Sequence, residues 1–317
     1  MIKGLAITPP VLGRISIGKV VEKNGKRLPE KDDQFTITSQ VQTRDGWLVH
    51  PLDELLRKEQ GGKIRSIPVR LLFNDPELNF RAEYSLFDRT SGRPLCVGNG
   101  ESCKRSTAEG IQSLPCPSPD GCPLAPGGNC KPYGRLNVAI GDDDPLGSFV
   151  FRTTGYNSIR TLSARLSYLQ ALSVDRLACL PLELRLRGKS TRQSHGSPIY
   201  YVDLTLRSGL SLEEALSQAH QLDQSRRDAG FDQQALDAAA RMGLVNGAFE
   251  DSEEDSHLVL EEFYPEQSVV ESAPAATSQK PTPQYSSRRS RNGKPTLHDL
   301  ILERTHNLQQ ANPPASA

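Results

Sequence analysis

The chain has 317 residues, and its 38 lysines and arginines balance its 38 aspartates and glutamates, so the formal net charge is zero. A neutral chain is not drawn as a whole to nucleic acid or to an anionic lipid surface. Only 36% of the residues are hydrophobic, a low share for a chain that folds throughout, so part of it is expected to remain unfolded.

The sequence shows no targeting or membrane segment. No long apolar run precedes Pro9, and no stretch approaches the roughly 18 apolar residues that span a bilayer. We therefore expect a cytoplasmic protein with no membrane contact. In that reducing compartment, clustered cysteines favour metal binding over disulfides.

Residues 1–95 are expected to form mostly strands. Apolar residues alternate with other residues at 67–73 and 80–86, which is the two-residue period of half-buried strands. The Asn-Asp-Pro sequence at 74–76 predicts a turn between these two strands. A short helix is predicted at 52–59, where three leucines share one side and two glycines follow.

Strands and helices are then expected to alternate. The pattern predicts a strand at 134–140, another around Phe149 and Phe151, and a helix from about Asn157 with apolar residues at helical spacing. The run of acidic residues after this first strand predicts a solvated turn rather than a magnesium site.

Two strands and two helices follow. Alternating apolar residues predict paired strands at 182–187 and 200–206. The Ser-Leu-Glu-Glu sequence at 211–214 is a capping box, which predicts the start of a helix. A second short helix is predicted at 232–242.

Residues 246–317 are expected to be a disordered tail. Its first part is rich in Glu and Asp and its middle part in Ser, Pro, Ala, Thr and Gln, a composition typical of linkers. The apolar residues between Leu297 and Leu308 predict either a short helix that orders on a partner or a frayed end. Residues 1–245 are expected to form a single α+β domain.

Five of the six cysteines lie close together, and Cys179 stands apart. Proline and glycine fill the gaps between the five, so this segment is not expected to build a helix or a core of its own. A zinc ion held by four thiolates is the expected source of its order, and free thiols in a flexible loop are the alternative. The five candidate ligands are Cys96, Cys103, Cys116, Cys122 and Cys130.

The spacing of the cysteines does not settle the ligand set. Cys116, Cys122 and Cys130 are predicted ligands, because glycines between them let the backbone fold around an ion. The fourth ligand is either Cys103 or Cys96. A site closed by four thiolates has no open position, so the zinc is expected to be structural rather than catalytic.

A local excess of basic residues occupies 152–192. This surface could meet phosphates, an acidic partner or the acidic tail of the same chain, or it could be the ordinary solvated face of a strand and a helix. Within this range, only Asp175 and Glu183 carry a negative charge. The basic residues are Arg152, Arg160, Arg165, Arg176, Arg185, Arg187, Lys189 and Arg192.

No catalytic motif is present. The sequence lacks the Gly-x-Ser-x-Gly, Walker and His-Glu-x-x-His patterns, and its six histidines are scattered. The chain is therefore not expected to be an enzyme.

Several short motifs in a fixed order, spread over about residues 10–210, resemble one family. That family is the phage recombination directionality factors, which act on large serine integrases. The motifs are Ile15-Ser-Ile-Gly-Lys-Val, Gly25-Lys-Arg-Leu-Pro-Glu-Lys-Asp-Asp-Gln-Phe-Thr-Ile-Thr-Ser, Cys96-Val-Gly-Asn-Gly, Cys116-Pro, Cys122-Pro, Cys130-Lys-Pro-Tyr-Gly-Arg-Leu, Phe151-Arg-Thr-Thr-Gly-Tyr-Asn-Ser-Ile and Pro198-Ile-Tyr-Tyr-Val-Asp-Leu.

The resemblance implies a regulator of site-specific DNA recombination in a phage or another mobile genetic element. Such a factor binds the integrase, contacts DNA indirectly or weakly, and shifts the integrase between insertion and excision. The implied partner is a site-specific recombinase, with large serine integrases as first candidates. The resemblance also favours Cys96 over Cys103, which leaves the fourth ligand open.

The expected fold is α+β. It consists of a mainly antiparallel β body with a cysteine-rich zinc loop inserted at about 94–135, two or three helices and a disordered C-terminal tail. The alternative function is that of a zinc-loop nucleic-acid-binding accessory protein of a phage or conjugative element.

Overall fold

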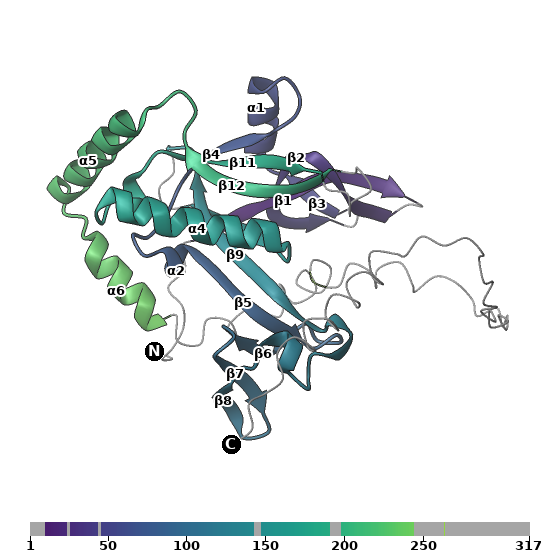
Figure 1. Ribbon diagram of the computed structural model, residues 1–317. Coiled ribbons are helices and arrows are strands. Elements are labelled where there is room, and N and C mark those ends of the chain that lie inside the picture. The colour runs from purple at the N-terminus through teal and green to yellow at the C-terminus, as the bar shows by residue number, and fades with distance from the viewer. Residues whose placement is uncertain are drawn as a thin grey trace, which may run out of the picture. The chain divides into compact units, whose positions relative to one another are not determined.

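A large mixed sheet forms the body of the protein (Figure 1). The computed structural model describes residues 10–23, 26–43, 46–142, 147–190, 198–243 and Phe263, all within the unit Met1–Glu271. The α+β class predicted from the sequence is confirmed, since the sheet is mostly antiparallel and helices pack on it.

The sheet contains 12 strands. Nine of them follow the order β3-β2-β1-β10-β9-β5-β6-β7-β8, and β4, β11 and β12 join through the pairing of β4 with β9. Among the described strands, β1 and β10 pair in parallel and the other pairs are antiparallel. The strands are β1 (Val11–Lys23), β2 (Lys26–Thr43), β3 (Gly46–Val49), β4 (Ser66–Arg70), β5 (Phe80–Phe87), β6 (Pro94–Gly98), β7 (Ser102–Thr107), β8 (Gly110–Pro115), β9 (Cys130–Ile140), β10 (Ser148–Thr153), β11 (Leu182–Lys189) and β12 (Ile199–Leu206).

More helices form than the two or three expected. The described residues contain four helices of nine or more residues, and these lie where the sequence predicts helices at 52–59, from about Asn157, from 211 and at 232–242. The helices are α1 (Pro51–Glu59), α2 (Pro76–Asn79), α3 (Ser118–Gly121), α4 (Tyr156–Ser173), α5 (Leu212–Asp228) and α6 (Gln233–Gly243), with 3-10 turns η1 (Pro126–Gly128) and η2 (Leu177–Cys179).

Local signals in the sequence place most helix starts correctly. The capping box of α5 is confirmed, since the Ser211 hydroxyl accepts from the Glu214 amide and the Glu214 carboxylate accepts from the Ser211 amide. The turn predicted at 74–76 is instead the start of α2, because the Asp75 carboxylate accepts from the Glu77 amide and caps a helical turn.

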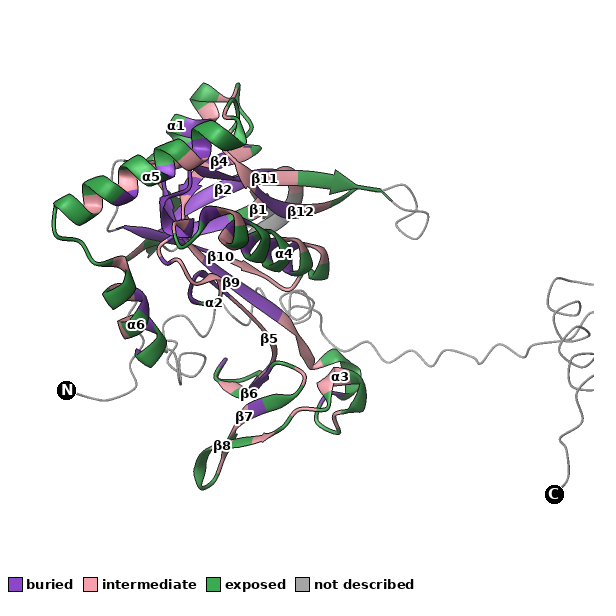
Figure 2. Ribbon diagram, turned by 60° about the vertical axis from the view of Figure 1, so that its left-hand side comes forward, coloured by how far each residue is buried: buried purple, intermediate pink, exposed green. Residues whose placement is uncertain are grey.

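The main core lies between α4 and the strands behind it (Figure 2). On α4, Ile159, Leu162, Leu166 and Leu169 recur at helical spacing and are buried, as their spacing predicts. The predicted strands at 182–187 and 200–206 pair as β11 and β12, and their alternate leucines and Val202 face this core.

A buried carboxylate fastens α1 to the sheet. The Asp53 side chain is 3% exposed and accepts from the Ile37 amide at 2.8 Å. It also pairs with Arg57 one turn later in the helix, and Arg57 in turn donates to the Phe35 carbonyl at 3.0 Å. Helix α1 is thus held through charge-assisted hydrogen bonds to the backbone of β2.

The substitution Asp53→Ala is expected to destabilise the fold by about 3 kcal/mol, because it leaves the buried Ile37 amide without its side-chain acceptor and Arg57 without its carboxylate partner. A urea titration followed by circular dichroism measures this loss. The matched control is Asp33→Ala, which removes only the exposed ion pairs with Lys63 and Arg65 and is expected to change the midpoint little. Equal midpoints for the two variants would contradict the assigned role of Asp53.

The strands β6, β7 and β8 with α3 and η1 form an extension that we call the cysteine arm, residues 94–129 (Figure 1). The expectation that this segment builds no helix is wrong, since α3 forms within it, and three strands that the sequence did not predict form as well. Gly100 and Gly110 adopt φ values of 100° and 107° in the two hairpin turns, a region that favours glycine, so the intervening residues can pair as strands.

Two sets of predictions fall largely outside the described residues. The acidic turn is described only as far as Asp142, and of the predicted tail at 246–317 the structure describes only Phe263. Within the part of the chain that is described, no helix is long and apolar enough to cross a membrane.

Candidate metal centre in the cysteine arm

Strand register places three cysteines on one face of the sheet. Leu86 on β5 lies opposite Cys96 on β6 and opposite Cys130 on β9. Cys103 on β7 lies opposite Gly98, two residues beyond Cys96. Since side chains alternate between the two faces of a strand, Cys96, Cys103 and Cys130 all face the same side.

The chain after β8 folds back and adds the other two cysteines. The Cys116 amide donates to the Glu101 carbonyl at 2.9 Å, which holds this segment against the β6–β7 turn. The short helix α3 follows, and the Cys122 carbonyl then accepts from the Ala125 amide at 3.1 Å. All five candidate cysteines line one cavity of about 20 Å³, and Cys179 lies elsewhere.

Gly98 makes the close approach of two cysteines possible. A Cβ atom at this position would lie 2.6 Å from the Cys103 Cβ and 3.0 Å from the Cys116 sulfur, and the first of these distances is too short for real atoms. Any larger residue would therefore separate Cys103 from Cys116 or fill the cavity between them.

The substitution Gly98→Ala is expected to loosen the arm. Overpacking of this kind costs about 1–3 kcal/mol, which corresponds to roughly 5- to 150-fold faster local opening. Amide hydrogen exchange in β6, β7 and β8 measures it. The control is Gly188→Ala on β11, where a new Cβ would meet Tyr200 at an ordinary 3.4 Å. Unchanged exchange in the Gly98 variant would show that the cavity tolerates an extra carbon.

Burial and mutual repulsion keep two of the thiols protonated. The pKa of Cys103 is raised to about 11 by burial first and then by its hydrogen bond with Cys96. Burial, followed by negative charge on Cys96, raises the pKa of Cys130 to about 11. A cation placed beside these two thiols would favour their ionised form.

A positive side chain, Arg105, lines the same cavity. Its Nε is buried and has no hydrogen-bond partner within the described structure, and its pKa is raised mainly through interaction with the Cys96 sulfur. Sequence reasoning missed Arg105, although its position two residues after Cys103 places both side chains on one face of β7. This guanidinium can offset the negative charge of a thiolate cluster.

The donor set fits zinc in its chemistry but not in its arrangement. Sulfur is the typical ligand of structural zinc, and a cavity of about 20 Å³ is large enough for one ion. The six cysteines are free thiols, and no three histidine, cysteine, aspartate or glutamate side chains in the described ranges are placed to hold an ion as they stand. Coordination would require the thiols to rotate toward a common centre, so metal binding stays a prediction.

The basic residues at 152–192 are largely engaged within the protein. Arg165 and Arg187 both pair with the buried carboxylate of Asp203, at 3.0 and 3.3 Å. Two further pairs, Arg185 with Glu183 and Arg176 with Asp223, also use carboxylates that are nearly buried. These arginines stabilise the fold, which weakens the interpretation of this region as a phosphate-binding surface.

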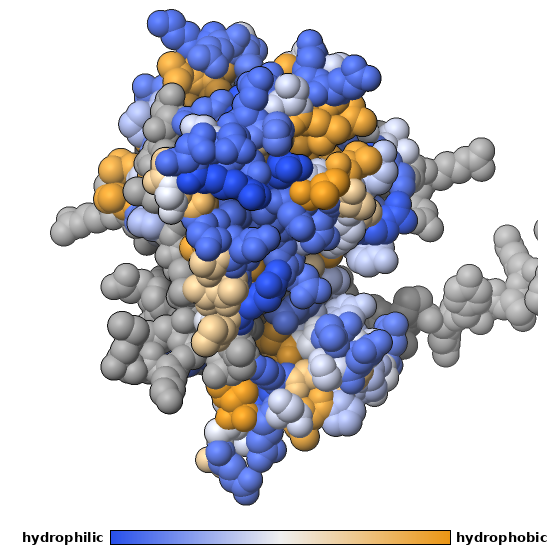
Figure 3. Space-filling model, turned by 90° about the vertical axis from the view of Figure 1, so that its left-hand side faces the viewer, coloured by the Kyte–Doolittle hydropathy of each residue, from blue (hydrophilic) through white to orange (hydrophobic). Residues whose placement is uncertain are grey.

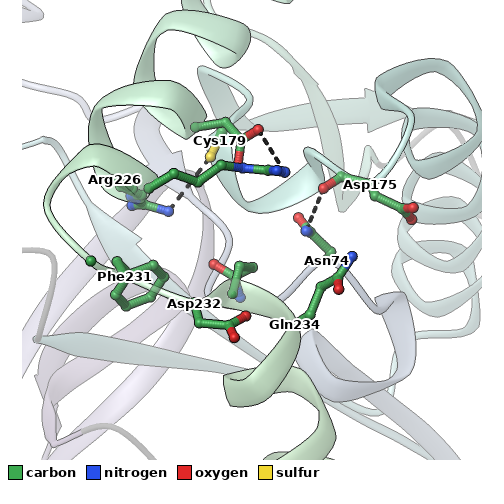
Figure 4. A pocket seen from close by; sticks show the side chains of 11 residues that line it. Asn74, Asp175, Cys179, Arg226, Phe231, Asp232 and Gln234 are labelled. Atoms are coloured by element: carbon green, nitrogen blue, oxygen red, sulfur yellow. Dashed lines mark hydrogen bonds and ion pairs between the residues drawn. The ribbon is translucent and has the colours of Figure 1, made fainter.

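A second cavity, of about 340 Å³, lies where α5 ends and α6 begins (Figure 4). The Cys179 sulfur faces this cavity and accepts a hydrogen bond from Arg226 at 3.6 Å. The Asp223 carboxylate forms an ion pair with Arg227. Burial raises the pKa of Cys179, which keeps this thiol neutral and a poor nucleophile. Cys179 is therefore not an activated nucleophile in this cavity.

The fold and the site together define an α+β protein that carries a cysteine-rich β arm. A family described as Gp3-like, recombination directionality factor-like, matches residues 12–207, which is more than half of the chain and includes the whole arm. The chain belongs to this family, and the resemblance predicted for about residues 10–210 is confirmed. No curated protein and no solved structure matches it.

Proposed function

We propose that this chain is a recombination directionality factor that binds a site-specific recombinase and changes which reaction the recombinase performs. The family match over residues 12–207 is the observation that carries this proposal. A large serine integrase is the first candidate partner. The factor itself needs no chemistry, because a protein that prefers one arrangement of the integrase on DNA shifts the population toward that arrangement.

The cysteine arm is the proposed contact surface. It exposes Leu95, Ile111 and Leu124, at 39%, 47% and 44% of their areas. Figure 3 shows hydrophobic areas at the lower end of the molecule, where the arm lies in Figure 1. Exposed apolar side chains on a small projecting element favour protein contact over contact with DNA phosphates.

Zinc is proposed to shape this arm through Cys96, Cys116, Cys122 and Cys130. Cys103 is left out because its thiol donates to the Pro115 carbonyl at 3.7 Å, a partner that would repel a thiolate. When bound, the ion would join the α3 segment to the face of β6 and β9. A structural role follows, since four thiolates leave no open coordination position.

The test of the function is a recombination assay with the purified integrase of the same mobile element. Without the factor, the integrase is expected to join the two attachment sites that insert the element. Addition of the full chain is expected to suppress this reaction and to stimulate excision between the hybrid sites. No change in either reaction, despite complex formation with the integrase, would overturn the proposal.

The alternative is an accessory protein that binds nucleic acid directly. Contact with several phosphates would make its affinity for duplex DNA fall steeply with salt. Because the described arginines of 152–192 mostly pair with buried carboxylates, we expect weak or no binding to naked duplex at 150 mM salt, about the physiological ionic strength. A mobility-shift titration at two salt concentrations distinguishes the two functions.

A further inference from the structure

Phe263 lies far beyond the family match, in a segment whose composition predicts disorder, yet it is fully buried. Its ring makes edge-to-face contacts with Phe87, at a centroid distance of 4.8 Å, and with Tyr133, at 5.7 Å. Phe87 and Tyr133 also contact each other at 5.5 Å. These three rings form a cluster separate from the main core.

The side chains of Phe87 on β5 and Tyr133 on β9 lie on the face of the sheet opposite the cysteine cavity. Phe87 follows Leu86, which faces the cysteine cavity, so Phe87 faces the other way. Tyr133 is three residues after Cys130 on β9, an odd spacing that again selects the opposite face. Phe263 therefore packs at the root of the cysteine arm, behind the candidate metal centre.

Basic side chains make further contacts with Phe263 and Tyr133. Lys131 Nζ donates to the Phe263 carbonyl at 3.2 Å and lies 5.5 Å from the centre of its ring. The Arg135 guanidinium lies 5.8 Å from the Tyr133 ring. In sequence, Phe263 follows two glutamates. Phe87 and Tyr133 form an aromatic socket, and the basic side chains of Lys131 and Arg135 lie at its rim. This socket is complementary to an aromatic residue in an acidic segment.

We propose that Phe87, Lys131 and Tyr133 form a docking site for an aromatic residue in an acidic segment, and that Phe263 of the same chain occupies this site in cis. The segment is tethered to the body through α6, so its effective concentration at the socket is on the order of millimolar. Any partner that presents the same chemistry must displace Phe263 first. This contact would make the tail a competitor for a surface beside the arm.

The test uses the full chain with Phe263→Ala and a labelled synthetic peptide of residues 256–268. Fluorescence anisotropy is expected to show at least tenfold tighter peptide binding to this variant than to the wild type, in which the socket is occupied. A matched peptide with alanine in place of its phenylalanine is expected not to bind. Equal affinities for variant and wild type, or no binding to the variant, would overturn the proposal.

A second variant separates docking from general loosening of the structure. Adding Lys131→Glu to the Phe263→Ala chain removes the donor and reverses the charge at the rim, and is expected to weaken peptide binding at least tenfold. In the otherwise wild-type chain, Lys131→Glu is expected to speed cleavage after Glu262 by a glutamate-specific protease. Cleavage at an unchanged rate would show that Lys131 does not hold Phe263 in place.

Discussion

Replacing Cys122 with serine is expected to remove about one zinc ion per chain and to release α3 from the sheet. Cys122 lies beyond α3, in a stretch whose backbone holds together mainly through short-range turns. Structural zinc ions bind small peptides with free energies of about 10–16 kcal/mol, and this binding stabilises the folded segment. Losing one ligand therefore removes much of the order of the segment. The rest of the fold has its own core and is expected to remain folded.

Metal content by mass spectrometry and amide exchange in residues 94–129 measure this outcome. The matched control is Cys103→Ala, which removes a neighbouring thiol that we assign outside the ligand set, and is expected to retain zinc. Loss of zinc from the control but not from the Cys122 variant would reverse the assignment. A wild-type chain that is metal-free and has an equally well protected arm would refute the metal centre itself.

The body of the fold could be predicted from local patterns. The leucines of α4 repeat at helical spacing, and β5, β11 and β12 alternate apolar and polar residues, so period alone identifies each element. The strands of the arm are not predicted from the sequence, because proline and glycine are frequent there. Two of these glycines lie at hairpin turns and allow the strands to form. The local composition indicates turns, but it does not indicate that the residues between these turns pair as strands.

The convergence of the cysteines depends on register. Five cysteines in one stretch predicted a cluster, but which faces they occupy follows only from the pairing of Leu86 with both Cys96 and Cys130. Phe263 carries no local signal at all, because a single aromatic residue in an acidic segment has no period. Its contact with β5 and β9 is long-range and visible only in the folded chain.

The basic region shows how charge balance can differ between the sequence and the fold. A count of charges along residues 152–192 leaves open both a positive binding surface and ordinary solvated faces, since only two acidic residues lie within this range. The fold supplies Asp203 and Asp223 from outside that range, and both accept from its arginines. Charge balance along the sequence therefore differs from charge balance in space, which is the balance that a partner meets.

Replacing Ile111 with glutamate is expected to weaken the effect of the factor on its integrase about 30-fold while leaving the fold intact. Ile111 lies on β8, the edge strand of the arm, and is 47% exposed, so a charge there costs little in the free protein. In an interface the same charge would be buried without a partner. Central interface residues commonly contribute 2 kcal/mol or more, which predicts a loss of affinity of about 30-fold.

The assay compares stimulation of excision as each factor is titrated against a fixed amount of integrase. Leu55→Glu is the matched control, because Leu55 is similarly exposed, at 51%, but lies on α1, which Figure 1 shows at the opposite end of the body from β8. The Ile111 variant is expected to need about 30-fold more protein and the Leu55 variant no more than the wild type. If both variants stimulate excision like the wild type, the arm is not the contact surface. A loss confined to Leu55→Glu would move that surface to α1, and the cysteines would then support the fold without shaping the interface.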